Sequence, residues 1–165
     1  MKKTIIILAA ALLLAGGAGG YWWYVNRDRR MVTELVNNVV ALVKKEPSNL
    51  PHAGVLKFAR VDELFAEKVD LRCEEPAIGA VMTRDELKTM VSLMNRRIEK
   101  MDAAADNIEP EIAGDRAVFT FDAEFSGVVG GRKEYFNSVY QISGTAVKID
   151  GKWLISSLKA EEILQ

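Results

Sequence analysis

The sequence predicts an α+β domain in which helices cover one face of a strongly bent antiparallel sheet, giving a cone-shaped two-layer fold. The first observation is the helical spacing of apolar residues over the first half of the domain. The second is the alternation of apolar and polar residues, interrupted by turn dipeptides, over the remainder. Helices gathered on one side of an antiparallel sheet are typical of this class. The 165 residues predict one domain, at 31–165, after a hydrophobic segment at 1–30.

The N-terminal segment has the features of a membrane anchor. Ile5–Val25 carries no charge and follows two lysines, and a helix of that length spans a hydrocarbon core of roughly 30 Å. Tyr21–Tyr24 form an aromatic cluster typical of a membrane interface, and three arginines follow at positions 27, 29 and 30. We interpret the segment as an uncleaved anchor. Because a short N-terminal tail normally stays inside, the domain is expected in the periplasm or outside the cell.

A cleaved signal peptide is the alternative to this anchor. The apolar core Ile5–Leu14 has the length of a signal-peptide core, and the small residues at 18–20 offer a cleavage site. The aromatic and basic flank favours the anchor, because these residues complete a membrane span. Under the alternative, the mature domain would be secreted.

Two amphipathic helices and a strand are predicted to open the domain. Apolar residues at positions 32, 35, 36, 39, 42 and 43 form one stripe at helical spacing, which Pro47 and Pro51 are expected to end. A shorter helix fits the apolar positions of Val55–Phe65. Alternation over Val69–Cys73 then predicts a strand with one buried face.

A third helix is predicted from its start signal. Pro76 and Gly79 are expected to break the preceding strand, and Thr83 with Glu86 forms a capping box. Apolar residues over Leu87–Met101 follow at helical spacing. The methionines on this stripe are expected to fill a core face.

Four strands joined by tight turns are predicted to complete the domain. The first contains Ile108 and Ile112, the second covers 117–125, the third about 132–149, and the last begins at Trp153. Turn dipeptides separate them at positions 114–115, 130–131 and 150–151. Gly144 within the third strand suggests a bulge or bend. The expected order is helix, helix, strand, helix and four strands, preceded by the N-terminal hydrophobic helix.

This order and several local patterns resemble the nuclear transport factor 2-like superfamily, also called SnoaL-like or cystatin-like, which includes ketosteroid isomerase. The patterns are K-V-D-L-R-C-E at 68–74, T-R-D-E-L at 83–87, I-x-P-x-I-x-G-D-R-A-V-F at 108–119 and D-G-K-W-L-I at 150–155. The resemblance covers roughly residues 31–163. It implies a cone with a pocket between sheet and helix, and frequent dimerisation through the sheet. None of the patterns is a catalytic signature, and such folds host many functions.

Residues that could support acid–base chemistry are not expected in this pocket. The isomerase branch uses a carboxylate base with a tyrosine and a protonated aspartate. Here the first helix of the domain has no tyrosine, and Asp70, Asp122 and Glu124 alternate with the residues expected in the core. The single histidine, His52, lies in a proline-flanked loop and cannot alone form a typical zinc site. We predict no catalytic residue, metal ligand or cofactor.

The net charge and the cysteine content limit the partners and the disulfides that we expect. The formal net charge of -1 provides no basic field for nucleic acid, which is not an expected partner. One cysteine, Cys73, allows no intramolecular disulfide. It is expected to be a small buried residue in a strand, and intermolecular pairing or a reactive thiol is the alternative.

Six residues are candidates for lining the cavity of the cone. They lie on the apolar face of the second meander strand, on the later long strands and on the third helix. Tyr140 and Trp153 could present a polar edge to a ligand, although core packing is the stronger expectation. The six are Met94, Phe119, Phe121, Phe125, Tyr140 and Trp153.

Two functions fit these observations. The first is a non-enzymatic, membrane-tethered domain that contacts other proteins, either an envelope protein or a second copy through the sheet. The second is a binder of a small apolar ligand, or a lyase or isomerase acting on one. The anchor, the apolar inner face and the missing acid–base set favour the first. The second requires a polar side chain that points into an open cavity.

Overall fold

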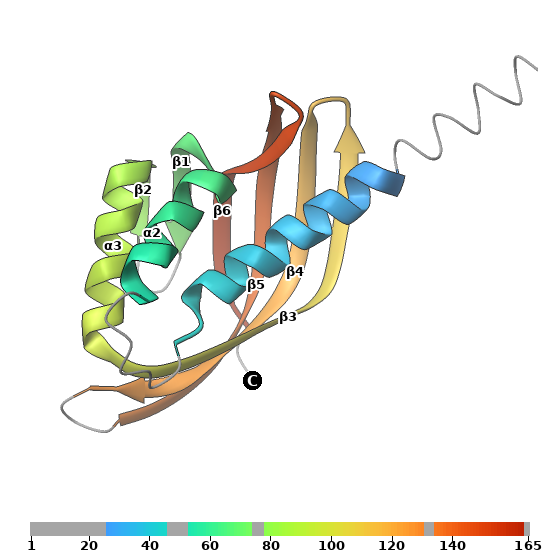
Figure 1. Ribbon diagram of the computed structural model, residues 1–165. Helices are drawn as coiled ribbons and strands as arrows, with labels where there is room; N and C mark the ends of the chain where they lie inside the picture. The colour runs from blue at the N-terminus through green and yellow to red at the C-terminus, as the bar shows by residue number, and fades with distance from the viewer. Residues whose placement is uncertain (1–25, 46–52, 74–77, 131–133, 164–165) are drawn as a thin grey trace, which may run out of the picture.

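The computed structural model describes residues 26–45, 53–73, 78–130 and 134–163, and it confirms an α+β domain (Figure 1). A helix at residues 26–43 comes first. The elements that follow are α2 (Ala53–Leu64), β1 (Phe65–Cys73), β2 (Ile78–Thr83), α3 (Arg84–Arg97), β3 (Ile98–Ala113), β4 (Arg116–Val129), β5 (Glu134–Ile149) and β6 (Lys152–Glu162).

The strands form one curved sheet in the order β2-β1-β6-β5-β4-β3. Neighbouring strands run antiparallel except β1 and β6, which are parallel. The first helix lies across the long strands, and α2 and α3 lie on the same side of the sheet near β1 and β2 (Figure 1). The described helices therefore cover one face of the sheet, as the sequence predicted.

Alternation along β4 sends one set of side chains into the core. Phe119 and Phe121 are buried, and their ring centroids lie 6.2 Å apart. Val118 and Thr120, which alternate with them, are exposed on the other face. The apolar stripe of the first helix packs into the same core cluster. This confirms the inner face that the sequence predicted for the strand.

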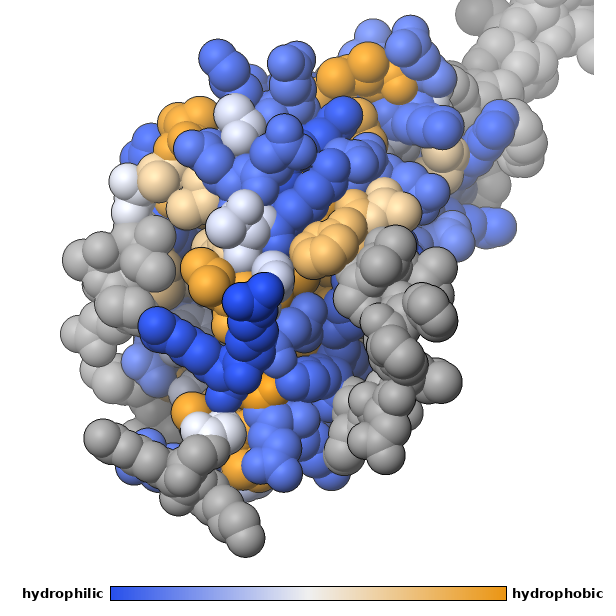
Figure 2. Space-filling model, turned by 60° about the vertical axis from the view of Figure 1, so that its left-hand side comes forward, coloured by the Kyte–Doolittle hydropathy of each residue, from blue (hydrophilic) through white to orange (hydrophobic). Residues whose placement is uncertain are grey.

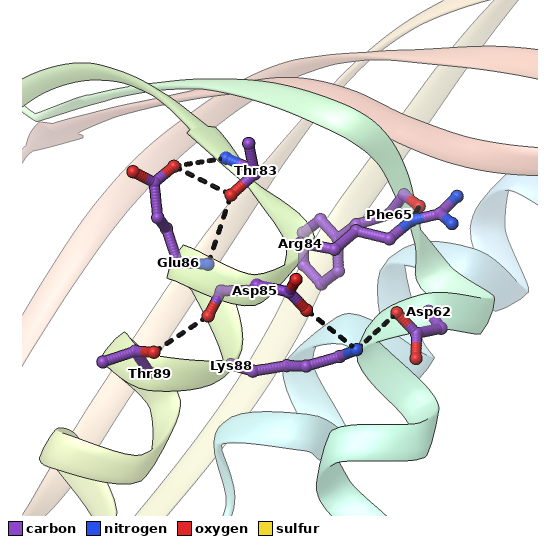
Figure 3. Close-up of polar contacts among 8 residues, drawn as sticks. All are labelled: Asp62, Phe65, Thr83, Arg84, Asp85, Glu86, Lys88 and Thr89. Atoms are coloured by element: carbon purple, nitrogen blue, oxygen red, sulfur yellow. Dashed lines mark hydrogen bonds and ion pairs between the residues drawn. The ribbon is translucent and has the colours of Figure 1, made fainter.

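The start of α3 confirms the predicted capping box (Figure 3). The Glu86 N–H donates to the Thr83 hydroxyl, and the Glu86 carboxylate accepts from the Thr83 N–H at 2.7 Å. Arg84 Nε donates to the carbonyl oxygen of Phe65 at 2.8 Å, which ties the helix to the start of β1. Lys88 forms an ion pair at 2.8 Å with Asp62 of α2. The capping box and these two contacts fix where α3 begins and how it lies beside α2.

The sheet contains a strand that the sequence analysis did not predict. β2 pairs antiparallel with β1 and forms one edge of the sheet, although Gly79 was expected to break the chain. Its sequence, I-G-A-V-M-T, is short and nearly all apolar, so it shows no alternation. Pairing with β1 decides its conformation, and the predicted order lacked this strand.

Two helices end earlier than predicted. α3 ends at Arg97, so Ile98 and Met101, which seemed to continue its apolar stripe, belong to β3. α2 ends at Leu64, and Phe65 begins β1. A spacing of three residues fits a helix by coincidence at these positions. Strand pairing, for example of Ile98 with Val129, overrides it.

The β5–β6 turn confirms the strongest hairpin signal of the sequence. Asp150 and Gly151 both adopt positive φ, 50° and 78°, as a type I′ turn requires. Gly144 lies opposite Phe119, and a Cβ there would come within 3.0 Å of its ring. The expected irregularity lies beside Gly144, where the β5–β6 register shifts between Thr145 and Ala146.

The predicted anchor, Ile5–Val25, lies outside the described residues. Within the part of the chain that the structure describes, no helix has both the length and the apolar character needed to cross a bilayer. The described part of the first helix starts at position 26 and includes the arginines at positions 27, 29 and 30.

Candidate functional site

In the described part of the chain, side chains fill most of the space between the helices and the sheet, and an open groove of about 210 Å³ remains where the first helix, α2 and the start of β6 meet. The first helix contributes its whole apolar stripe to the core, and the sheet contributes alternating residues of its inner face. The largest buried members include Phe119, Phe121, Phe65 and Trp153. In a cone-shaped fold, this is the space that a ligand would occupy.

A small cavity remains where the end of the first helix, α3 and the start of β3 meet. Its volume is about 20 Å³. That volume holds about one water molecule, whereas ligand pockets measure about 300–1,000 Å³. This cavity therefore has no room for a steroid-sized ligand. Its lining residues are Leu42, Val43, Lys45, Val91, Met94, Asn95, Ile98 and Met101.

Lys45 supplies the ammonium group beside this cavity, and that group is bound to backbone. Its Nζ donates to the carbonyl oxygens of Asn95 and Ile98 at the end of α3. A cation at this position satisfies carbonyls that lack a partner within the helix and complements the helix dipole. The Lys45 backbone also pairs with Met101 through both its N–H and its carbonyl. The Lys45 side chain thus caps the C-terminal end of α3.

Lys57 of α2 lies close to Lys45 and has a perturbed titration. Burial, and then the positive charge of Lys45, lower the pKa of Lys57. Its Nζ donates to the carbonyl oxygen of Lys44 at 2.6 Å and to Asn95 Oδ1 at 3.4 Å. A lowered amine pKa is one requirement for a nucleophile. Lys57 does not line the 20 Å³ cavity, and its ammonium is bound to the end of the first helix and to α3.

A buried carboxylate joins the first helix to the sheet. Asp28 is 1% exposed, and both its oxygens accept from Lys148 Nζ at 3.0 Å. Trp153 Nε1 donates to the same carboxylate at 3.3 Å. A buried charge requires such a paired and hydrogen-bonded environment. These contacts occupy the carboxylate, so we assign it a structural role.

The sequence carried a signal for Asp28 that the sequence analysis missed. The arginines on either side of Asp28 were interpreted as the basic flank of the anchor, and the aspartate was given no role in the domain. It lies four positions before Val32 and eight before Val36, so it continues the apolar stripe of the first helix. A carboxylate on a core-facing stripe indicates a buried partner.

The structure places the six cavity candidates in different environments. Met94 lines the 20 Å³ cavity, while Phe119, Phe121 and Trp153 are buried in the core. Phe125 and Tyr140 are half-buried, and their rings meet edge to face with centroids 5.9 Å apart. The Trp153 indole bonds to Asp28, so its polar edge is used within the protein.

The described residues offer no metal site. No group of three His, Cys, Asp or Glu side chains comes together in the part of the chain that the structure covers. His52 lies outside the described residues. Cys73, expected to be buried, is only half-buried, because it is the last residue of β1 and lies at the end of the described strand.

The other face of the sheet carries a polar groove of about 280 Å³. Asp70 points into this groove, as its alternation predicted, and its carboxylate binds Arg72 through three hydrogen bonds. Lys159 forms an ion pair with Glu161. Val118 is 49% exposed, which makes it the most exposed apolar residue in the lining of this groove. The groove is lined by Asp70, Arg72, Val118, Ser143, Gly144, Thr145, Ser157, Leu158 and Lys159.

Comparison with solved structures shows which fold this arrangement represents. No protein-family model and no curated protein matches this sequence. The structure is similar to a nuclear transport factor 2-like superfamily protein from Salmonella enterica, with a TM-score of 0.66 and 16% identity, covering 83% of this chain and 92% of that one. The chain has the nuclear transport factor 2-like fold.

Two further solved structures are also similar to this chain. The Kfla4162 protein from Kribbella flavida has a TM-score of 0.70 at 14% identity, covering 85% of this chain and 93% of that one. The hexachlorocyclohexane dehydrochlorinase LinA-type3 from Novosphingobium barchaimii has a TM-score of 0.68 at 14% identity, covering 84% and 88%. At such identities the similarity establishes the fold, while function must come from the site.

Proposed function

We propose that this protein is a membrane-tethered, extracytoplasmic domain that makes protein–protein contacts and catalyses no reaction. The observation that carries the proposal is the filled interior of the cone, where the described cavity measures about 20 Å³. The buried carboxylate of Asp28 is held by Lys148 and Trp153, so it is not available as a base. An acid–base enzyme needs such a group directed at a substrate.

The anchor part of the proposal rests on the uncharged segment Ile5–Val25 and its aromatic and basic flank. Three positions after Val25, Asp28 is fixed in the core of the domain. A domain attached this closely would stay near the bilayer. Cleavage of the segment is the alternative, and N-terminal sequencing of the mature protein distinguishes the two.

The outer face of the sheet is the contact surface we propose. Its groove combines hydroxyl groups with one exposed apolar residue, Val118. Arg72 and Lys159 are neutralised by Asp70 and Glu161, so the face can approach another protein without a net charge at its centre. Through this face the domain would bind a second copy or an envelope protein.

The α3 side offers a less continuous surface. Leu93 is 53% exposed there. On the face that comes forward in Figure 2, hydrophobic residues form separate patches among hydrophilic ones. Scattered apolar residues of this kind are normal on a protein surface and need no partner. We therefore place the contact on the outer face of the sheet.

The experiment compares two equally exposed apolar residues. Val118→Arg puts a charge into the outer groove, whereas Leu93→Arg puts one on α3 as the matched control. Light scattering measures the molar mass of the full-length protein in a mild detergent. In parallel, tagged protein is cross-linked in membranes and its partners are recovered. We expect a dimer or a defined partner that is lost only with Val118→Arg. A monomer without a cross-linked partner contradicts the proposal.

The alternative is a small-ligand binder, lyase or isomerase, and the likeness to a dehydrochlorinase is the observation that favours it. Under this alternative, the 20 Å³ cavity would open to admit an apolar molecule. Thermal unfolding with a set of apolar ligands tests it. A stabilising ligand whose effect disappears in Met94→Trp, which fills the cavity, would establish the alternative.

A further inference from the structure

A second groove lies where the first helix passes β3, at the end of the domain that adjoins the hydrophobic segment. It has a volume of about 500 Å³. All but one of its lining residues belong to the first helix, and Pro110 of β3 closes the other side. The lining residues are Asn26, Arg29, Arg30, Thr33, Glu34, Asn37 and Pro110. We call this the arginine groove.

The arginine groove occupies the side of the helix that faces away from the core. Its residues recur at intervals of three and four, which places them on one helical face. Asp28, Val32 and Val36 form the opposite, buried face. Because the contact of Asp28 with Lys148 fixes the rotation of the helix, Arg29 and Arg30 are held outward.

The groove has a positive centre and several hydrogen-bond donors. Arg29 and Arg30 are exposed, and neither forms an ion pair with a carboxylate of the described chain. Asn26 and Asn37 add amide groups at its two ends. Guanidinium groups bind phosphate oxygens in a bidentate manner, so a phosphate group matches this lining in both charge and shape.

Nearby carboxylates do not neutralise the two arginines. Glu34 is the one carboxylate in the lining, which leaves a net positive charge. Glu109 and Glu111 flank Pro110 in the sequence, but they pair with Thr120 and Val118 and so lie on the outer face of the sheet.

The position of the groove selects the source of the phosphate. Arg29 follows Val25 by four residues, and a helix of that length would rise by about 6 Å at 1.5 Å per residue. The polar layer of a bilayer extends about 5–8 Å beyond the hydrocarbon core on each side. Arg29 and Arg30 therefore lie at the depth of the lipid phosphates when Ile5–Val25 spans the membrane.

We propose that the arginine groove binds the phosphodiester headgroup of an anionic lipid in the bilayer that holds the anchor. The inference rests on the proposed membrane anchor and adds to it a lipid-binding site on the domain. The bound headgroup would keep the first helix, and with it the outer face of the sheet, in a fixed orientation above the membrane.

The test uses the full-length protein in mixed micelles with equal amounts of phosphatidylcholine and phosphatidylglycerol. Native mass spectrometry measures the ratio of the two lipids retained. Arg29→Gln/Arg30→Gln should lower the preference for phosphatidylglycerol about fivefold for each arginine. Arg96→Gln/Arg97→Gln removes an adjacent exposed pair from the end of α3 and should change nothing. Carbonate extraction of membranes measures anchoring separately.

Three results overturn the inference in different ways. If the protein resists carbonate extraction but shows no preference between the lipids, the anchor is supported and lipid binding by the arginine groove is overturned. If carbonate releases the protein, both the anchor and the lipid site are overturned. Stabilisation of the wild type by inorganic phosphate, without lipid preference, assigns the groove to a soluble anion. Retained anchoring with loss of preference in the Arg29→Gln/Arg30→Gln variant alone supports the inference.

Discussion

Asp28 and Lys148 are 120 residues apart in the chain, yet the Lys148 ammonium lies 3.0 Å from both oxygens of the Asp28 carboxylate. Asp28 lies in the first described turn of the first helix, and Lys148 lies near the end of β5. Trp153, just after the β5–β6 turn, donates to the same carboxylate. The β5–β6 hairpin thus binds the part of the first helix where the chain enters the domain.

Loss of the Asp28 carboxylate should destabilise the domain strongly. In Asp28→Ala, the Lys148 ammonium, whose side chain is 13% exposed, would lose the buried carboxylate to which it donates. Removing one member of a buried pair costs about 3–5 kcal/mol. Urea unfolding of full-length protein in a mild detergent, followed by far-UV circular dichroism, measures the change.

Two further variants separate this effect from a general loss of charge. Asp62→Ala removes a half-exposed partner of Lys88 and should cost less than about 1 kcal/mol. Asp28→Leu/Lys148→Met replaces both charges by apolar groups and should recover most of the stability. Equal unfolding midpoints for Asp28→Ala and Asp62→Ala would show that the buried pair has no special role.

Gly144 should tolerate a side chain far less well than Gly79. A Cβ at this position would come within 3.0 Å of both the Phe119 ring and the Ser157 carbonyl oxygen. Gly144→Ala should therefore cost about 1–3 kcal/mol through overpacking. Gly79→Ala is the control, because nothing lies within 4 Å of its Cβ. If Gly144→Ala and Gly79→Ala lower the thermal unfolding temperature by the same amount, overpacking at Gly144 is contradicted.

Local signals predicted the parts of the fold that local physics decides. Thr83 and Glu86 marked the start of α3, and Asp150-Gly151 marked the last hairpin. Alternation along β4 separated Phe119 from Val118 correctly, since one face of the strand is buried. In each case, neighbouring residues alone carry the information.

The elements whose conformation depends on residues distant in the sequence were mispredicted. The first residues of β3 match helical spacing, and only pairing with β4 shows that Ile98 begins a strand. β2 has no alternation of its own and depends on β1. The position of Asp28 on the apolar stripe indicated its burial, but its partner Lys148 could not be predicted, because the two charges lie at opposite ends of the domain sequence.

The side chain of Thr83 should contribute measurably to stability through the capping box. Its hydroxyl accepts from the Glu86 N–H, which has no partner within the helix. Thr83→Ala should cost about 1 kcal/mol. Thr89→Ala removes a hydroxyl that donates to the Asp85 carbonyl within α3 and should cost less, because that carbonyl keeps its helical environment. The two unfolding midpoints, measured under one condition, decide between these expectations.

The contribution of Glu86 should depend on pH. The N–H and the hydroxyl of Thr83 donate to its carboxylate and lower the pKa of Glu86 below the usual 4.5. Folding therefore favours the ionised form, so the stabilisation is complete above the unfolded-state pKa and is lost as the pH falls through the folded-state value. At pH 7, Glu86→Gln should be less stable than the wild type, and the difference should shrink as the pH falls towards about 3. Glu67→Gln, on the exposed side of β1, is the control. A Glu86→Gln difference that stays constant over this range would show that the carboxylate makes no charge-dependent bond to Thr83.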